Sequence, residues 1–232
     1  MTVQTHERPG AGVMDIIMVI LILGTLWGLS EVVFDDMLRA SGVPLRAAIL
    51  TGIGMGLLGI AVGMGKKGLI LPGIALVTVA ARQLAVPLLG CTFLCKANAS
   101  AAVLLEGMAL AGVVACTGRF VDRGISARAL TAAAGALMAA AAFYVVGTRL
   151  APCEYLLSFA ASGGLLSFMY GEGISWAAAS ALGFPLGYAL GTRAAEPVTH
   201  LRAEQPVSFY FSSALLLAAC WIAIAATIAG VL

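Results

Sequence analysis

Charge is what this 232-residue sequence has least of: 10% of its residues are Asp, Glu, Lys or Arg, whereas 61% are apolar. The net charge is +2 and no basic run occurs, which excludes nucleic acid as a partner and a polybasic segment that binds anionic lipid. Mean hydropathy is +1.03. Polar residues are therefore too few for a soluble domain, and the composition indicates a protein that lies in membrane lipid.

Recognisable catalytic motifs are also missing. The sequence has no Gly-x-Ser-x-Gly, His-Glu-x-x-His or Walker A pattern. Its two histidines, His6 and His200, fall outside the expected membrane spans, so neither is placed to ligate a haem there. We therefore expect no catalytic residues, no cofactor and no metal ligands, and we do not predict an enzyme.

Apolar runs of about twenty residues recur along the chain, which is the length that a helix needs to cross a bilayer core of roughly 30 Å. We predict an all-α fold, a polytopic integral membrane helical bundle with about seven transmembrane helices. It forms a single domain over residues 14–232, after a short cytoplasmic tail over residues 1–13. The expected helices cover residues 14–34, 47–65, 68–90, 98–118, 129–151, 173–192 and 208–231.

The stretch 156–171 is apolar but short, and Gly163-Gly164 interrupts it. Cytoplasmic loops carry an excess of Lys and Arg. If the stretch does not cross and the N-terminus is cytoplasmic, eight basic residues lie inside and four outside; if it crosses, the division is six and six. We therefore predict a re-entrant or interfacial segment near 156–171, in a multi-pass protein of the cell inner membrane. The four outside residues are Arg39, Arg46, Lys96 and Arg149.

Glycines recur at helical spacing within the expected helices. They are Gly183, Gly187 and Gly191 in one stripe, and the pairs Gly24 with Gly28, Gly52 with Gly56 and Gly59 with Gly63. Small residues let transmembrane helices approach closely. The glycines fit tight packing inside the monomer or a docking face for a partner membrane subunit.

Polar residues gather where the expected helices end on the outer side. They are Glu31, Asp35, Asp36, Cys91, Cys95, Lys96, Asn98, Arg149, Cys153, Glu154, Tyr155 and Glu172. This placement predicts an outward-facing polar basin, with Asn98 in its wall and with Arg149 and Glu154 as a gate at its mouth.

Two ionisable residues lie deeper. Arg82 and Glu106 are each eight residues from the outer end of a helix, hence about 12 Å below the surface at 1.5 Å per residue. An isolated charge at that depth is costly, so we expect an ion pair between Arg82 and Glu106. This pair is either a strut between two helices or part of a ligand site, with Gln83 at the same level.

Trp27 and Glu31 are four residues apart and share one face of the first helix. Trp27 fits an interfacial anchor, or the aromatic wall of a pocket whose floor is Glu31. In such a pocket Trp27 and Tyr155 stack on a ligand ring, and Arg82 or Lys96 pairs with an anionic group. The predicted ligand-binding residues are Trp27, Glu31, Arg82, Gln83, Asn98, Glu106, Arg149, Glu154 and Tyr155.

Three cysteines are expected on the outer side. Cys91 and Cys95 have the i, i+4 spacing, and Cys153 follows the fifth helix. They allow a soft-metal site, a disulfide between two of the three, or free packed thiols. The spacing is not Cys-x-x-Cys and no histidine is expected on this side, so no metal ligands are assigned.

Two segments resemble motifs of a known group of proteins. Gly24-Thr25-Leu26-Trp27-Gly28-Leu29-Ser30-Glu31 resembles a Trp-Gly-x-x-Glu signature of uncharacterised bacterial membrane proteins. Asn98-Ala99-Ser100-Ala101-Ala102-Val103-Leu104-Leu105-Glu106-Gly107 resembles their Asn-Pro-Ala…Leu-Glu-Gly/Ala segment, with Ala99 in place of proline. Those proteins are similar in size and hydropathy to the substrate-binding S components of energy-coupling-factor (ECF) vitamin transporters.

The resemblance implies a six-helix core that captures a vitamin or metal ion from outside, with residues 208–231 as an additional helix. It also implies a transmembrane coupling subunit and ATP-hydrolysing subunits on other chains, and the missing Walker motifs agree with that division. We therefore predict an uptake protein that captures a small molecule in an outward-facing pocket. The alternatives are a structural or assembly subunit of a larger membrane complex, and a thiol-redox enzyme that uses Cys91, Cys95 and Cys153.

Overall fold

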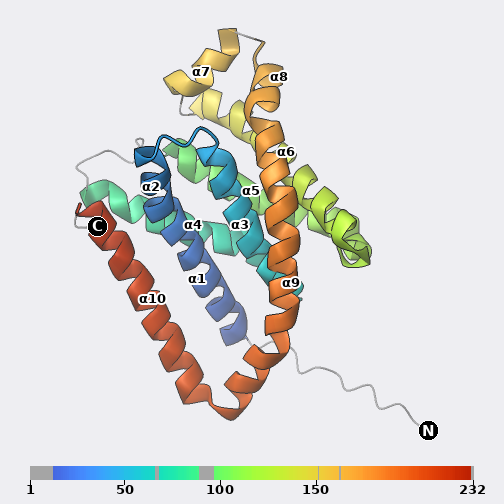
Figure 1. Cartoon of the computed structure of the whole chain (residues 1–232), viewed down its shortest axis with the longest axis vertical. Helices are drawn as coiled ribbons and strands as arrows, with labels where there is room; N and C mark the ends of the chain where they lie inside the picture. Colours follow the sequence, from blue (N-terminus) through green and yellow to red (C-terminus); the bar gives the residue numbers. More distant parts are fainter. Residues whose placement is uncertain (1–12, 66–67, 89–96, 151, 162, 231–232) are drawn as a thin grey trace.

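The computed structural model describes residues 13–65, 68–88, 97–150, 152–161 and 163–230, and these ranges contain helices and no β-strand (Figure 1). The long helices are α1 (Val13–Leu29), α3 (Arg46–Gly63), α4 (Ile70–Leu88), α5 (Ala97–Thr117), α6 (Ile125–Leu150), α9 (Ile174–Glu204) and α10 (Pro206–Ile228). The short elements are the π turns η1 (Ser30–Phe34) and η4 (Met169–Gly173), the 3₁₀ helix η3 (Gly118–Arg123), and the helices α2 (Asp35–Ala40), α7 (Glu154–Ala161) and α8 (Leu165–Phe168).

Five helical segments are long and apolar enough to cross a membrane. They are Val13–Ala40, Arg46–Gly63, Ala97–Arg123, Ile125–Leu150 and Pro206–Ile228. The described apolar part of α4, Ile70–Leu84, is shorter, and α9 is not among the five. The chain is therefore an all-helical, multi-pass, membrane-embedded protein, and a total of about seven crossings stays a prediction.

Helix α9 is the longest helix, runs down from below α8 in Figure 1, and packs most extensively against α3. A Cβ atom at Gly183 would overlap the carbonyl oxygen of Gly52, and one at Gly187 would overlap that of Gly56. The two backbones are in direct contact because neither helix has a side chain there. Packing inside the monomer is therefore confirmed for this stripe, and a docking face for a partner is wrong for it.

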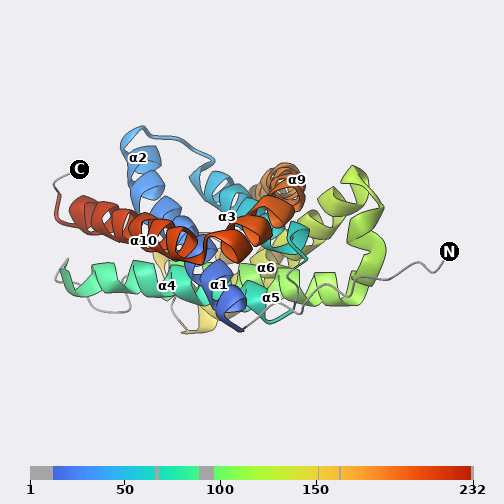
Figure 2. The same ribbon diagram turned by 90° about the horizontal axis from the view of Figure 1, so that it is seen from below.

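Helices α1 and α4 are held equally close by Gly24 and Gly28. A Cβ at Gly28 would lie 2.6 Å from the Cβ of Ala81, and the hydroxyl of Thr78 donates to the carbonyl oxygen of Gly24 at 3.0 Å. In Figure 2, α1 lies between α10 and α4, while η3 and the start of α6 extend to the opposite side. This tight crossing fixes which side chains of α4 face the end of α1.

The stretch 156–171 folds as two short helices. Gly163 and Gly164 have φ angles of 114° and 64°, and they reverse the chain between α7 and α8. The interruption predicted at these glycines is confirmed, and a re-entrant or interfacial position stays a prediction. Aromatic rings fasten the turn onto α6 and α9, since Phe168 lies 5.4 Å from Tyr144 and 6.3 Å from Trp176 between ring centroids.

The C-terminal end of α9 differs from the prediction, because the sequence predicts a loop between the helices expected at 173–192 and 208–231. The helix continues to Glu204 and accommodates Pro197. Two side-chain contacts support the extension: His200 contacts Glu204 at 3.1 Å, and Arg202 forms an ion pair with Asp15 in the first turn of α1. The charged residues that indicate a loop in the sequence thus lie on a helix instead. They form one contact within α9 and one contact from α9 to α1.

Candidate functional site

A π turn places two acidic side chains inside the bundle. The turn is η1, which joins α1 to α2 and is wider than an α-helical turn. Glu31 within η1 is 6% exposed, and Asp35, the first residue after η1, is 9% exposed. The hydroxyl of Ser30 donates to the carbonyl oxygen of Trp27 at 2.7 Å, a local bond from a side chain to the backbone where the π turn begins. Single π turns within α-helices are often found at functional sites.

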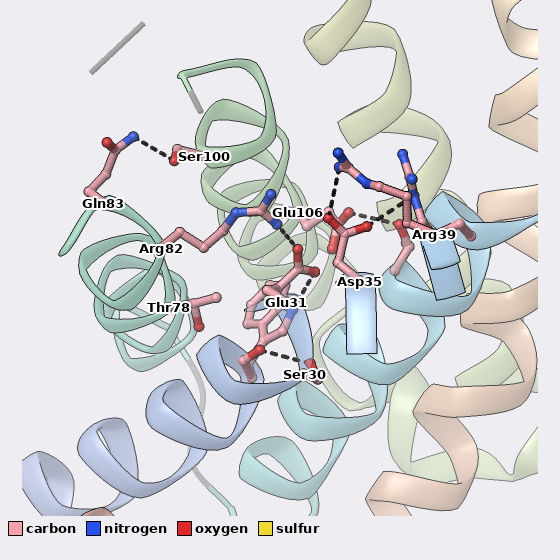
Figure 3. A network of polar contacts seen from close by, with 12 residues as sticks. Ser30, Glu31, Asp35, Arg39, Thr78, Arg82, Gln83, Ser100 and Glu106 are labelled. Atoms are coloured by element: carbon pink, nitrogen blue, oxygen red, sulfur yellow. Dashed lines mark hydrogen bonds and ion pairs between the residues drawn. The ribbon is translucent and has the colours of Figure 1, made fainter. Parts of the chain in front are cut away.

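Glu31 forms a buried ion pair with Arg82 of α4, and Figure 3 shows the two side chains pointing toward each other. The indole N–H of Trp27 donates to the second carboxylate oxygen of Glu31 at 3.3 Å. Both oxygens of this carboxylate are therefore partnered. Trp27 is 0% exposed and its ring lies against Gly54, so its interpretation as an interfacial anchor is wrong.

The sequence predicts an ion pair between Arg82 and Glu106, and this prediction is wrong. Arg82 is paired, but with Glu31. The cause is the close crossing of α1 and α4. Gly28 packs on Ala81, and Glu31, about one turn further along the same helix face, meets Arg82, the residue that follows Ala81. Matched depth on neighbouring helices places Glu106 at the correct level, but depth does not give the rotation of a helix about its axis.

Glu106 lies on α5 and is 3% exposed. One of its oxygens accepts a hydrogen bond from the hydroxyl of Thr51 on α3 at 2.9 Å, as Figure 3 shows, and the other has no hydrogen-bond partner among the described residues. Glu106 also interacts electrostatically with Glu31 and Arg82. A buried acceptor without a partner is unusual in a folded protein and costs free energy unless a ligand or water satisfies it.

Gln83 repeats this pattern one residue beyond Arg82. Its amide nitrogen donates to the hydroxyl of Ser100 on α5 at 2.8 Å, while its amide oxygen has no partner among the described residues. Asn98 is half-buried in the first turn of α5, with its side-chain oxygen near Gly147 of α6. Several predicted residues thus lie on neighbouring helices. We call these residues, together with Thr51 and Ser100, the buried polar cluster: Trp27, Glu31, Thr51, Arg82, Gln83, Ser100 and Glu106.

Asp35 forms a second ionic group next to the buried polar cluster. Its carboxylate contacts Arg46 at 2.9 Å and Arg39 at 3.4 Å, and it ties the end of α1 and α2 to the start of α3 (Figure 3). The sequence analysis noted Asp35 as an outer polar residue but gave it no partner. The negative charge of Asp35 is therefore compensated by two arginines beside it.

The two predicted gate residues, Arg149 and Glu154, are exposed, and so is Tyr155, which is predicted to stack on a ligand ring. Arg149 lies near the end of α6, and Glu154 and Tyr155 open α7. The ring of Tyr155 meets Phe159 edge-on at 5.4 Å. Tyr155 is 48% exposed, and the partial burial of its phenol raises its pKa, as does its hydrogen bond with Glu172. Gating by Arg149 and Glu154 stays a prediction.

No protein-family model, curated protein or solved structure matches this chain. Among the predicted cysteines, Cys153 is a half-buried free thiol, and Cys91 and Cys95 lie outside the described residues, as does Lys96. Within the described ranges, no group of three His, Cys, Asp or Glu side chains is placed to share a metal ion.

A surface hollow of about 490 Å³ lies where α9 turns into α10, at the opposite end of α9 from η4. It is lined by Arg193, Glu196, Pro197, His200, Leu201, Glu204 and Gln205. It shares no residue with the buried polar cluster, and its lining comes from the polar end of one helix and the residue after it. We therefore assign the candidate site to the cluster.

Sequence reasoning missed Thr51 and Ser100, which bind Glu106 and Gln83. The signal for Thr51 was weak but present: it is the only hydroxyl residue of α3, and its helix is otherwise apolar except for Arg46. A single hydroxyl within an apolar membrane helix often bonds to a neighbouring helix. Ser100 lies between small residues and offered no such contrast.

Thr51→Val tests the bond to Glu106. The valine has nearly the same shape but no donor, so the Glu106 oxygen that Thr51 binds loses its partner and neither oxygen of this buried carboxyl then has one. We expect the free energy of unfolding to fall by about 1–3 kcal/mol, measured by thermal unfolding in detergent. Thr199→Val is the matched control, because Thr199 is exposed and bonds only to its own helix at Ala195, and a change within about 0.5 kcal/mol is expected. Equal effects of the two substitutions would show that the bond between Thr51 and Glu106 contributes nothing.

Proposed function

We propose that this chain is a substrate-binding and uptake protein that captures a small molecule at the buried polar cluster from the outer side of the membrane. The observation that carries the proposal is the unpartnered oxygen of Glu106, which is buried between membrane helices. A polar network that served only as a strut would satisfy its own members, as Glu31 and Arg82 do. Ionisable groups inside a membrane bundle are costly and usually mark a ligand or ion site.

The two motif segments support this assignment because they converge on the cluster. The first segment supplies Trp27 and Glu31, and the second supplies Ser100 and Glu106. Their glycines have packing roles: Gly28 meets Ala81, and a Cβ at Gly107 would lie 2.6 Å from the Cβ of Ala75. Each segment thus combines a glycine that brings α4 close with a polar side chain directed to the same site.

We further propose that the protein works as ECF S components do, with a separate transmembrane coupling subunit and ATP-hydrolysing subunits, in the cell inner membrane with a cytoplasmic N-terminus. The support is the resemblance of these two segments and the excess of basic residues in the expected inner loops. The assembly alternative has lost one of its supports, since the glycines of α3 and α9 are used within the monomer.

Native mass spectrometry of the protein purified in mild detergent tests the proposal. We expect the wild-type chain to retain a small molecule of defined mass, and Glu106→Ala to lose it. Glu196→Ala is the control, because Glu196 is an exposed carboxylate on α9, and it should retain the adduct. A bare wild-type chain found only with stoichiometric partner subunits would instead support the assembly role.

A further inference from the structure

The charges of the buried polar cluster indicate what kind of molecule it accepts. Arg82 is neutralised by Glu31 and Asp35 is neutralised by Arg46 and Arg39. Glu106 is the remaining buried carboxyl, and its contact is the hydroxyl of Thr51, which carries no charge. Glu106 is therefore the one of these three buried carboxyl groups that has no cation in direct contact, and the additional arginine of the Asp35 group lies on Asp35 instead.

The unpartnered atoms have the same character. The second oxygen of Glu106 and the amide oxygen of Gln83 are both hydrogen-bond acceptors. A ligand that satisfies them must bring N–H or O–H donors. A positive charge on that ligand would also balance Glu106, and charge-assisted hydrogen bonds to a carboxylate are about twice as strong as neutral ones.

An anionic ligand would meet the opposite conditions. To bind Arg82 it would have to share the guanidinium with Glu31 or displace it, and in either case it would lie close to two carboxyl groups, Glu31 and Glu106. Displacing Glu31 would also break a buried pair, which is strongly destabilising. The pairing of an anionic group with Arg82, which the sequence analysis considered, is thus disfavoured by the contact that Arg82 already makes.

We propose that the site recognises an organic cation, such as an amidinium, a protonated amine or a protonated nitrogen heterocycle, and that Glu106 is the carboxylate that binds its charge. This inference rests on the proposed function. An organic cation needs a single carboxylate, which Glu106 supplies, and the amide oxygen of Gln83 is a further acceptor on α4. A metal ion takes several such ligands, and the described residues place no group of three around it.

Three probes of nearly identical shape test the charge: benzamidinium, benzamide and benzoate are a cation, a neutral molecule and an anion on the same ring. We expect benzamidinium alone to raise the melting temperature of the purified full-length protein, in proportion to its occupancy. Glu106→Gln keeps the shape and removes the charge, and it should weaken benzamidinium binding by about thirtyfold, roughly 2 kcal/mol. Glu196→Gln is the control and should bind as the wild type does.

Each other outcome overturns the inference. Benzamide binding that is equal in the wild type and in Glu106→Gln would mean that Glu106 acts as a neutral acid on a neutral ligand. If benzoate binds the wild type and Arg82→Met abolishes this binding, the site prefers anions. A thermal shift with Ni²⁺ or Co²⁺, but with none of the organic probes, would replace the organic cation by a metal. In all these cases the copurified small molecule still decides the proposed function separately.

A second measurement covers the event that Glu106→Gln does not fold. A hydrophobic carbodiimide modifies buried carboxyl groups in the wild-type chain, and peptide mass spectrometry locates the modification. Benzamidinium should protect Glu106 severalfold, whereas benzoate should not. Equal modification of Glu106 with and without benzamidinium would overturn the inference without any substitution.

Discussion

Arg82→Met is expected to lower the free energy of unfolding by about 3–5 kcal/mol, because it leaves Glu31 buried and ionic without its cation. Both side chains of the pair are almost fully buried, at 7% and 6% exposure, so water does not replace the lost contact. Methionine keeps most of the volume of the arginine stem, and the effect is therefore electrostatic rather than a cavity. Thermal or denaturant unfolding in detergent measures it.

The double variant Glu31→Gln, Arg82→Met separates two effects: the cost of leaving Glu31 buried without a cation, and the loss of the contact between the two side chains. With neither charge present, no buried ion is left alone, and most of the lost stability should return. Arg39→Met is the matched control, since the arginine of that pair is 58% exposed and its loss should cost at most about 1 kcal/mol. If Arg82→Met and Arg39→Met had the same effect, another group would have to balance Glu31.

The sequence predicts most of the helices because lipid leaves few other choices. Apolar length gave α3, α5, α6 and α10 to within a few residues of their ends, and the glycine pair at 163–164 located a real break. The extension of α9 to Glu204 was missed because its last residues are polar, and the apolar length of a segment gives no estimate of where such a helix ends. A helix outside the membrane is limited by its own contacts, and Arg202 with Asp15 supplies one.

The candidate site was predicted in its members and not in its connections. Arg82 and Glu106 are predicted because ionisable residues are rare at their depth, and Trp27 and Glu31 because they share one helix face; all four are buried. Pairing needs the rotation of each helix, which depends on where glycines let two backbones meet. That information is in the sequence as the spacing of Gly24 and Gly28, but it identifies a close helix without naming its partner.

Gly187→Ala is expected to have the second large effect, a loss of at least about 1–3 kcal/mol in the free energy of unfolding. Its new methyl group would overlap the carbonyl oxygen of Gly56, and a backbone atom in a helix has no rotamer by which to move away. The two helices must separate along their largest interface. Gly112→Ala is the matched control on α5: its Cβ meets nothing within 4 Å, so it should be neutral or stabilising by up to about 1 kcal/mol.

The same interface links stability to the candidate site, and two further glycines separate the effects. Gly183→Ala would push on Gly52, the residue after Thr51, whereas Gly191→Ala would push on Ile60, more than two turns away along α3. Both should destabilise the protein to a similar degree, since each alanine would overlap a backbone carbonyl oxygen. Only Gly183→Ala should also move the Thr51 hydroxyl from Glu106 and weaken benzamidinium binding in the protein that remains folded. Equal affinities in the two variants would show that Glu106 binds its ligand without help from α3, and would place recognition on α4 and α5 alone.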